Sequence, residues 1–533
     1  MRTPLLALLV PSLLTACADY KMASEDYGET ADTGYSPSWD SDADTDADMD
    51  ADTDADTDED GWAAEDENDF LALRPAQTDV FVFVANPSRG TITRINVENK
   101  EVLTASVGKN PSAVLTTPDY GTAVVFNKGD DSVTVLDAQT MEGPEIAVRD
   151  NFNSMVMSPD GEWVALWHSL AAEQDDDVPP TGLQSFNEAS FVNVRSGDHY
   201  PMAVGFNPRG IQFTPDGTLA IVVSDEYLAM VDLTAQHLTP DLIQVADDLL
   251  DPPRAEEVLI TPSGEYAFVR QFGAQDLLVV DLLVGSKDRV PVGLNPTDLD
   301  LSPDGTEAVV VSRGSHELYL LDVAAPLDVP RVLTMPTEDP FGSLLFDPSG
   351  RQAVLYTTAV ATDRYASWDL DTDEITLRPL VKPVKGMAVT PTGDTLMAFH
   401  TQGDVPDADP TSPFYNQWAL SLIDLDSFRT NPLLLDAEPV GYANSYTGEH
   451  GYFVMKDVDA LVKLRYDTLL PDVIPLKSKP VYVGVFPQLD GVSGEPAAWV
   501  SQEHDLGRIS FYDPDDNTLE TITGFELNSQ IED

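Results

Sequence analysis

Basic residues and cysteine are scarce in this chain of 533 residues. It has 29 Lys and Arg against 92 Asp and Glu, which gives a formal net charge of −63 at pH 7. Acidity this strong argues against nucleic acid and anionic lipid surfaces as partners, because both are themselves negatively charged. Cys17 is the single cysteine of the chain, so no disulfide can form within it.

The chain also lacks an apolar run long enough to span a bilayer. The first run, residues 5–14, follows Arg2 and has the length of a signal-peptide core. It ends in Leu-Thr-Ala-Cys at residues 14–17, which resembles the lipobox of bacterial lipoproteins. That resemblance implies that residues 1–17 are a lipoprotein signal peptide and that Cys17 becomes lipidated. The alternative is an ordinary signal peptide with a chance cysteine.

The lipobox resemblance also implies a location. The residue after Cys17 is Ala18 and not Asp, which by analogy with lipoprotein sorting favours the outer membrane. We therefore expect a protein of the bacterial cell envelope on its periplasmic or surface face. Membrane contact would be made through the lipid anchor alone.

Residues 18–69 lack the apolar side chains of a folded domain. They hold 21 Asp or Glu and one Lys, and Asp alternates with Ala or Thr through much of the segment. Like charges this dense repel one another and cannot bury a core. We expect a disordered acidic tether that holds residues 70–533 away from the membrane.

The end of this tether contains a calcium-loop spacing. Asp56, Asp58, Asp60, Gly61 and Glu67 fit the pattern D-x-D-x-D-G-x5-E of an EF-hand, which supplies carboxylates to a hard cation. A repeat with Asp at every second position generates half of this pattern by chance, and no amphipathic helix precedes it. Ca²⁺ is the one cofactor that the sequence suggests, either at this site or bound diffusely by the whole tract.

What the remainder does contain is a recurring turn. Pro-Asp-Gly or a near variant stands between apolar strand-like segments at intervals of 41 to 56 residues. A strand-rich repeat with a period of roughly 40–50 residues is typical of a β-propeller. The turns begin at Pro118, Pro159, Pro215, Pro262, Pro303, Pro348, Pro391, Tyr446 and Pro487.

Each repeat contains four predicted strands. In the second repeat these are residues 112–116, 122–127, 132–137 and 145–148, which show period-two alternation and β-branched residues. Ten such repeats fit into residues 70–533, the first strand being 70–74. The sequence thus predicts an all-β propeller of about ten four-stranded units. They form either one large ring or two smaller rings from a five-unit duplication.

An aspartate closes the third strand in six repeats. Its expected role is structural, because Asp accepts the N–H groups of a following turn. The six are Asp137, Asp232, Asp281, Asp322, Asp369 and Asp424.

Two repeats depart from the common length. The third and the eighth each carry an insert between the second and third strands, at residues 171–187 and 402–416. In both, the second strand ends in a histidine, His168 or His400. Inserted loops on a rigid scaffold often bind ligands, and propellers also simply tolerate them. The two histidines are candidate binding residues, or else ordinary strand-end residues.

The sequence of residues 80–137 resembles the YVTN-type β-propeller repeat. The matching segments are residues 80–86, 90–97, 105–108, 110–111 and 117–119, and later repeats resemble TolB-like and YncE-like periplasmic propellers. The resemblance implies a binding or scaffolding module for an envelope or extracellular protein, peptide or glycan. Some relatives of this kind are lactonases or quinoprotein enzymes, and fold analogy alone does not choose between these roles.

Few residues point to catalysis. The chain has no G-x-S-x-G elbow, Walker loop, dinucleotide fingerprint or H-E-x-x-H pair. A metal-assisted lactonase or hydrolase would need carboxylates that converge on the central channel. Asp298, Asp300, Asp347 and Ser445 are the channel candidates, of which Asp298 and Asp300 share one face of a strand. We expect a binding module, and keep the hydrolase as the alternative.

Overall fold

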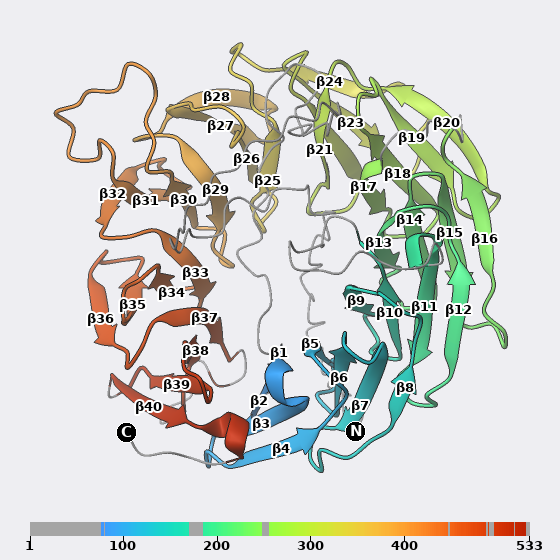
Figure 1. Cartoon of the computed structure of the whole chain (residues 1–533). Helices are drawn as coiled ribbons and strands as arrows, with labels where there is room; N and C mark the ends of the chain where they lie inside the picture. Colours follow the sequence, from blue (N-terminus) through green and yellow to red (C-terminus); the bar gives the residue numbers. More distant parts are fainter. Residues whose placement is uncertain are drawn as a thin grey trace, which may run out of the picture.

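The computed structural model describes residues 76–78, 80–169, 185–247, 255–445, 448–486, 489, 495–515 and 517–528. These residues form ten antiparallel sheets of four strands each, and every sheet follows the chain order of its strands. The sheets, called blades 1 to 10 here, stand side by side in one ring around a central axis (Figure 1). The chain is a ten-bladed β-propeller, so the prediction of about ten four-stranded units is confirmed, and the units form one ring rather than two.

The strands of the first five blades have the following bounds: β1 (Ala76–Gln77), β2 (Phe81–Asn86), β3 (Thr91–Asn96), β4 (Val102–Ser106), β5 (Pro111–Thr116), β6 (Thr122–Asn127), β7 (Ser132–Asp137), β8 (Glu145–Ala147), β9 (Ser154–Met157), β10 (Trp163–Trp167), β11 (Glu188–Asn193), β12 (His199–Ala203), β13 (Pro208–Phe213), β14 (Leu219–Ser224), β15 (Tyr227–Asp232), β16 (Pro240–Gln244), β17 (Ala255–Ile260), β18 (Tyr266–Gln271), β19 (Asp276–Asp281) and β20 (Ser286–Pro291).

The strands of the second five blades are β21 (Pro296–Leu301), β22 (Glu307–Ser312), β23 (Glu317–Asp322), β24 (Arg331–Thr334), β25 (Ser343–Phe346), β26 (Gln352–Tyr356), β27 (Arg364–Asp369), β28 (Glu374–Pro379), β29 (Val384–Val389), β30 (Thr395–His400), β31 (Trp418–Asp424), β32 (Thr430–Leu435), β33 (Pro439–Asn444), β34 (His450–Met455), β35 (Ala460–Arg465), β36 (Pro471–Pro475), β37 (Pro480–Val485), β38 (Ala498–Gln502), β39 (Arg508–Asp513) and β40 (Thr518–Thr523). Three short 3₁₀ turns complete the described elements: η1 (Pro87–Arg89), η2 (Ser185–Asn187) and η3 (Phe525–Leu527).

Strand positions follow the repeat closely. In blade 2 the predicted second and third strands, 122–127 and 132–137, coincide with β6 and β7. The predicted first strand at 70–74 lies outside the described residues, and β1 begins at Ala76. Among the residues that the structure describes, no helix is long and apolar enough to cross a membrane.

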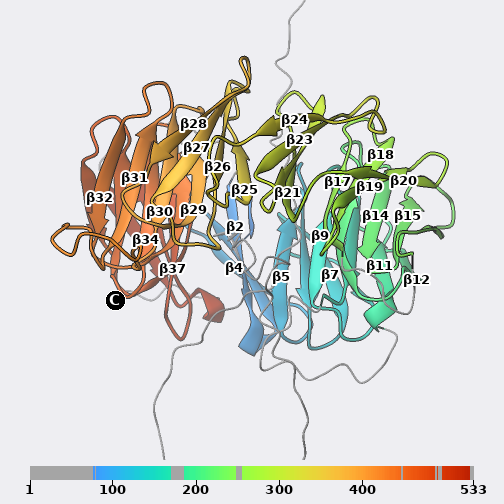
Figure 2. The same cartoon turned by 90° about the horizontal axis from the view of Figure 1, so that it is seen from above.

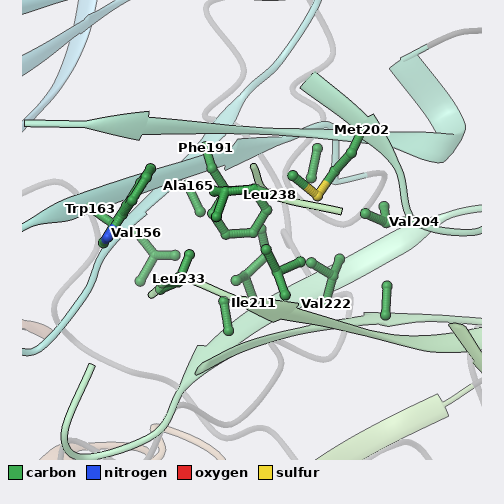
Figure 3. Close-up of a cluster of buried hydrophobic side chains, with 14 residues drawn as sticks. Val156, Trp163, Ala165, Phe191, Met202, Val204, Ile211, Val222, Leu233 and Leu238 are labelled. Carbon is green, nitrogen blue, oxygen red and sulfur yellow. The ribbon is translucent and has the colours of Figure 1, made fainter. Parts of the chain in front are cut away.

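The core is divided among the interfaces between blades. The described residues form ten buried apolar clusters, one for each pair of neighbouring blades. Figure 3 shows the cluster between blades 3 and 4, where Phe191 and Met202 of blade 3 meet Ile211 and Val222 of blade 4. Neighbouring blades cover both faces of the second and third strands of each blade in this way. The sequences of these strands are therefore nearly continuous apolar runs.

Ring closure joins blade 10 to blade 1 through side chains. Trp499 and Phe511 of blade 10 pack in one cluster with Val82 and Ile95 of blade 1. The Gln77 amide donates to the carbonyl of Val485 at 2.6 Å, and its oxygen accepts from the Trp499 indole at 2.5 Å. The ring is therefore closed by packing and hydrogen bonds, since each sheet is built from consecutive strands.

Antiparallel pairing gives the ring two unlike faces (Figure 2). The loops from first to second and from third to fourth strands lie on one face, here called the turn face. The loops from second to third strands, and the connections from one blade to the next, lie on the other face, here called the insert face. The blade-8 insert lies on the insert face, whereas residues 171–184 of the predicted blade-3 insert lie outside the described residues.

The Pro-Asp-Gly turns pack against one another around the turn face. In blade 4 the Thr214 hydroxyl donates to Asp216 at 2.7 Å and accepts the Leu219 N–H at 3.1 Å. Gly217 has φ of +69°, and a Cβ there would lie 2.7 Å from Asp160 Cγ in the turn of blade 3. The turns thus need Gly both for its backbone conformation and for the approach of the neighbouring turn.

Candidate functional site

The insert face carries a buried polar side chain at the end of most second strands. In seven blades the last residue of that strand is Asn, Ser, Gln or His with at most 5% of its surface exposed. The seven are Asn86, Asn127, Ser224, Gln271, Ser312, His400 and Gln502. Several of them bind a hydroxyl on the third strand: Asn127 donates to Thr134 at 2.8 Å, and Gln502 donates to Ser510 at 2.6 Å.

His400 occupies this same position in blade 8. Its Nδ1 donates to the Lys382 carbonyl at 2.8 Å, and its Nε2 accepts from the Ser421 hydroxyl at 2.7 Å. It is fully buried, and burial lowers the pKa of His400 to about 4. The neutral His400 ring therefore links the segment that enters blade 8 to the third strand of that blade by hydrogen bonds. Gln502 makes the corresponding link in blade 10.

His168 lies one residue beyond the end of β10 in blade 3. It is 5% exposed, its Nδ1 lies 2.7 Å from the Asn151 carbonyl, and its ring meets Phe186 edge-on at 5.2 Å. Blades 3 and 8 stand on opposite sides of the ring (Figure 1). Each histidine is thus buried within its own blade, and the two do not face each other across the channel.

The channel candidates fall into two groups. Asp298 is fully buried on β21 and accepts N–H groups from Leu299 at 2.8 Å and from Leu344 of blade 7 at 2.5 Å, so it joins two blades. Asp300, on the same strand, is 7% exposed. Asp347 and Ser445 lie instead in turns of the turn face, where they accept the N–H groups of Ser349 and His450.

No group of three or more His, Cys, Asp or Glu in the described part of the chain is arranged to hold a metal ion. The carboxylate cluster that a metal-assisted lactonase or hydrolase would need is therefore missing from these residues. Cys17 and the calcium-loop candidates Asp56, Asp58, Asp60 and Glu67 lie outside the described residues.

The blade-8 insert, residues 401–417, is a long loop of the insert face, and all of its residues are described. It leaves the ring between β30 and β31 as the projecting orange loop of Figure 1. Short turns hold it together, in which Ala408, Ser412 and Gln417 donate to carbonyls three residues earlier at 3.0–3.1 Å. The carboxylates of Asp407 and Asp409 are on exposed residues of this loop.

The insert is attached to the ring by Lys382, which the sequence interpretation missed. Lys382 lies in the connection between β28 and β29, and its side chain is 2% exposed. Its Nζ donates to the carbonyls of Gln402, Phe414 and Gln417 and lies 3.2 Å from Asp404 Oδ1. One signal was present in the sequence: a cation, Lys382, lies in the connection that precedes a blade with an insert.

Comparisons with known proteins found similarity to solved structures alone. No protein-family model matches the chain, and no curated protein sequence matches it. Among solved structures, dihydro-heme d1 dehydrogenase NirN in complex with DHE shows 17% identity over 68% of this chain and 74% of its own, with a TM-score of 0.44.

Two further solved structures are similar in the same limited sense. A eukaryotic initiation factor shows 10% identity over 75% of this chain and 97% of its own, with a TM-score of 0.49. The β-propeller domain of Cps50 (Swd1) from Myceliophteria thermophila shows 13% identity over 61% and 97%, with a TM-score of 0.32. The class that the fold defines is the β-propeller, and this fold by itself does not decide a function.

Proposed function

We propose that this chain is a lipid-anchored β-propeller of the bacterial cell envelope that binds its partner through the insert face. The lipobox at Cys17, the acidic segment 18–69 and the resemblance to YVTN, YncE and TolB propellers support the location. In this proposal the tether places a rigid ring at a distance from the outer membrane. The partner is an envelope or extracellular protein, peptide or glycan.

The observation that carries the binding role is the ordered blade-8 insert. Its 17 residues, 401–417, depart from the shorter connections that the blades other than 3 and 8 have at this point. A loop of this length on a rigid scaffold is where binding residues usually lie. Because backbone turns within the insert are already formed, binding would cost little ordering entropy.

The charges on the insert face favour a partner of opposite charge. Asp407 and Asp409 are exposed on the insert, and Asp457 and Asp459 are exposed on the corresponding loop of blade 9, the next blade of the ring. Lys479 pairs with Asp457, and the exposed Lys456 lies on the same blade-9 loop, so two cations partly offset this acidity. A basic protein segment or peptide fits such a surface better than a neutral glycan does.

Two substitutions in the insert test the binding surface. The full chain is immobilised as parent, as Asp407→Asn with Asp409→Asn, and as a turn-face control with Glu98→Gln and Asp371→Asn. All four residues are exposed. We expect an envelope protein that the parent and the control retain and that the insert variant retains at least fivefold less, as measured by quantitative mass spectrometry.

The salt dependence of that capture is a second readout. Capture through exposed carboxylates weakens between 0.05 M and 0.5 M NaCl, because ions screen exposed charges. Equal retention by the parent, the insert variant and the control would contradict the proposed surface. Fractionation of Cys17→Ser cells tests the anchor separately: the variant is expected in the soluble fraction, and continued membrane association would contradict lipidation.

A further inference from the structure

The ammonium group of Lys382 lies in an oxygen cage built by the blade-8 insert. Its three carbonyl neighbours are Gln402 O at 3.1 Å, Phe414 O at 3.0 Å and Gln417 O at 2.7 Å. A fourth oxygen neighbour of the ammonium group is the Asp404 carboxylate at 3.2 Å. Carbonyl and carboxylate oxygens converging on one point are the ligand set of a hard cation. Here a side chain of the protein supplies the positive charge.

The cage gathers both ends of the insert. Gln402 and Asp404 stand at its start, and Phe414 and Gln417 stand at its end. Asp404 strengthens the closure, because its second oxygen accepts the N–H of Asn416 at 2.7 Å. The loop between these ends is therefore closed at its base around a single ammonium group.

Burial makes this ammonium hard to replace. The Lys382 side chain is 2% exposed and that of Asp404 is 10% exposed. A neutral residue at 382 would leave Asp404 without its counter-ion and three carbonyls without their donor. Buried polar groups that lose their partners raise the free energy of the folded chain. We therefore expect the loop to open so that water can bind these groups.

We propose that Lys382 acts as a built-in cation that holds the blade-8 insert in one conformation. It does for this loop what a bound metal ion does for calcium-binding loops. The consequence for partner binding rests on the proposed function, since a fixed insert presents Asp407 and Asp409 in a defined arrangement. The fixing of the loop itself does not depend on any partner.

Hydrogen exchange of the full chain tests the clamp. Lys382→Met keeps the length of the stem and removes the charge and the donors. We expect amides of residues 401–417, with Asn416 foremost, to exchange at least tenfold faster in this variant, while residues 122–127 of blade 2 exchange as in the parent. Lys479→Met, which removes a half-exposed lysine of the same face, is the matched control and leaves the insert unchanged.

A second variant covers the case in which Lys382→Met does not fold. Asp404→Asn keeps the shape of its side chain and removes the counter-charge, and it is expected to speed exchange of the insert about threefold. Unchanged exchange of residues 401–417 in the folded variants would overturn the clamp.

Chemical rescue separates a cation from a merely space-filling side chain. In Lys382→Ala, 50 mM n-butylammonium is expected to slow exchange of the insert again, because it brings both charge and N–H donors. Tetramethylammonium brings the charge without donors and is expected to do nothing. Rescue by neither ion, or equal rescue by both, would overturn the role of Lys382 as a hydrogen-bonding cation.

These results are distinguishable from a failure of the proposed function. If the parent retains no partner but Lys382→Met loosens the insert, the clamp stands and the binding surface fails. If the parent retains a partner through Asp407 and Asp409 while Lys382→Met leaves exchange unchanged, the binding surface stands and the clamp fails.

Discussion

On the turn face seven glycines of these turns lie against the turn of the blade before them, whereas the described loops of the insert face bond mainly to their own blades. A Cβ at Gly161 would lie 2.7 Å from Pro118, and one at Gly448 would lie 2.5 Å from Thr392. By contrast, Thr401 at the start of the blade-8 insert donates to Pro383, in the connection that enters the same blade.

This difference explains where the repeat can vary. Where a turn lies against the turn of the neighbouring blade, as Gly161 and Gly217 do, little room is left for extra residues. Blade 10 is an exception, with twelve residues between β37 and β38. On the insert face a loop can lengthen outward, as the blade-8 insert does (Figure 1). The regular face holds the ring together, and the irregular face is the one on which function can be added.

Replacing glycine by alanine should give the largest difference in stability between the turn face and the insert face. Gly161→Ala places a side chain at φ +70° and against Pro118, so we expect a loss of about 2–4 kcal/mol in unfolding free energy. Gly403→Ala, on the insert, has ordinary φ and a nearest neighbour at 3.8 Å, and should change stability by less than about 0.5 kcal/mol. Urea unfolding measures both, and equal losses would contradict the contrast.

The buried histidine of the insert face should make stability depend on pH. Burial lowers the pKa of His400 to about 4, below the value of about 6.5 in an unfolded chain. Its contribution is complete above pH 6.5 and falls as pH drops towards 4, because the unfolded chain takes up a proton that the native chain refuses. The drop amounts to about 3 kcal/mol.

His400→Gln should remove that drop, because Gln already serves at the same position as Gln502 in blade 10. Unfolding free energies at pH 7.5 and pH 4.5 measure the effect in parent and variant. His237→Gln replaces an exposed histidine and serves as the control. A variant with the same pH slope as the parent would show that His400 does not titrate as its burial implies.

Lowering the pH should reduce the unfolding free energy less through the turn aspartates than through His400. The Thr214 hydroxyl, and then the N–H of Thr218, hold the pKa of Asp216 below its ordinary value. That stabilisation is present above the unfolded pKa, near 4, and is lost as pH falls through the lowered pKa. Asp216→Asn should therefore be less stable than the parent at pH 7, and the difference should shrink below pH 4.

Asp407→Asn on the insert is the matched comparison for this small effect. Its carboxylate is on an exposed residue outside the stacked turns, so thermal unfolding at pH 7 should match the parent. If Asp407→Asn lowered stability as much as Asp216→Asn, the turn carboxylates would have no special role in holding the ring.

Much of the fold was readable from the repeat, while the site was not. The turn spacing predicted ten units, and β6 and β7 lie where alternation placed them. The aspartates that close third strands accept turn N–H groups as expected; for example, Asp137 accepts from Thr140 at 2.8 Å. His168 and His400 drew attention because they end the second strands of the two repeats with inserts. In the structure His400 belongs to a row of buried polar strand ends, and His168 lies buried one residue beyond the end of β10.

The sequence by itself determined the blade, because alternation, Pro-Asp-Gly turns and strand-closing aspartates are local signals that act within a few residues. It also located the two inserts. The tertiary structure alone decided that ten blades close into one ring, through contacts such as Gln77 with Val485 that are 408 residues apart. It likewise brought Lys382 to the base of the insert, because that cage is built by carbonyl groups whose position no side-chain pattern records.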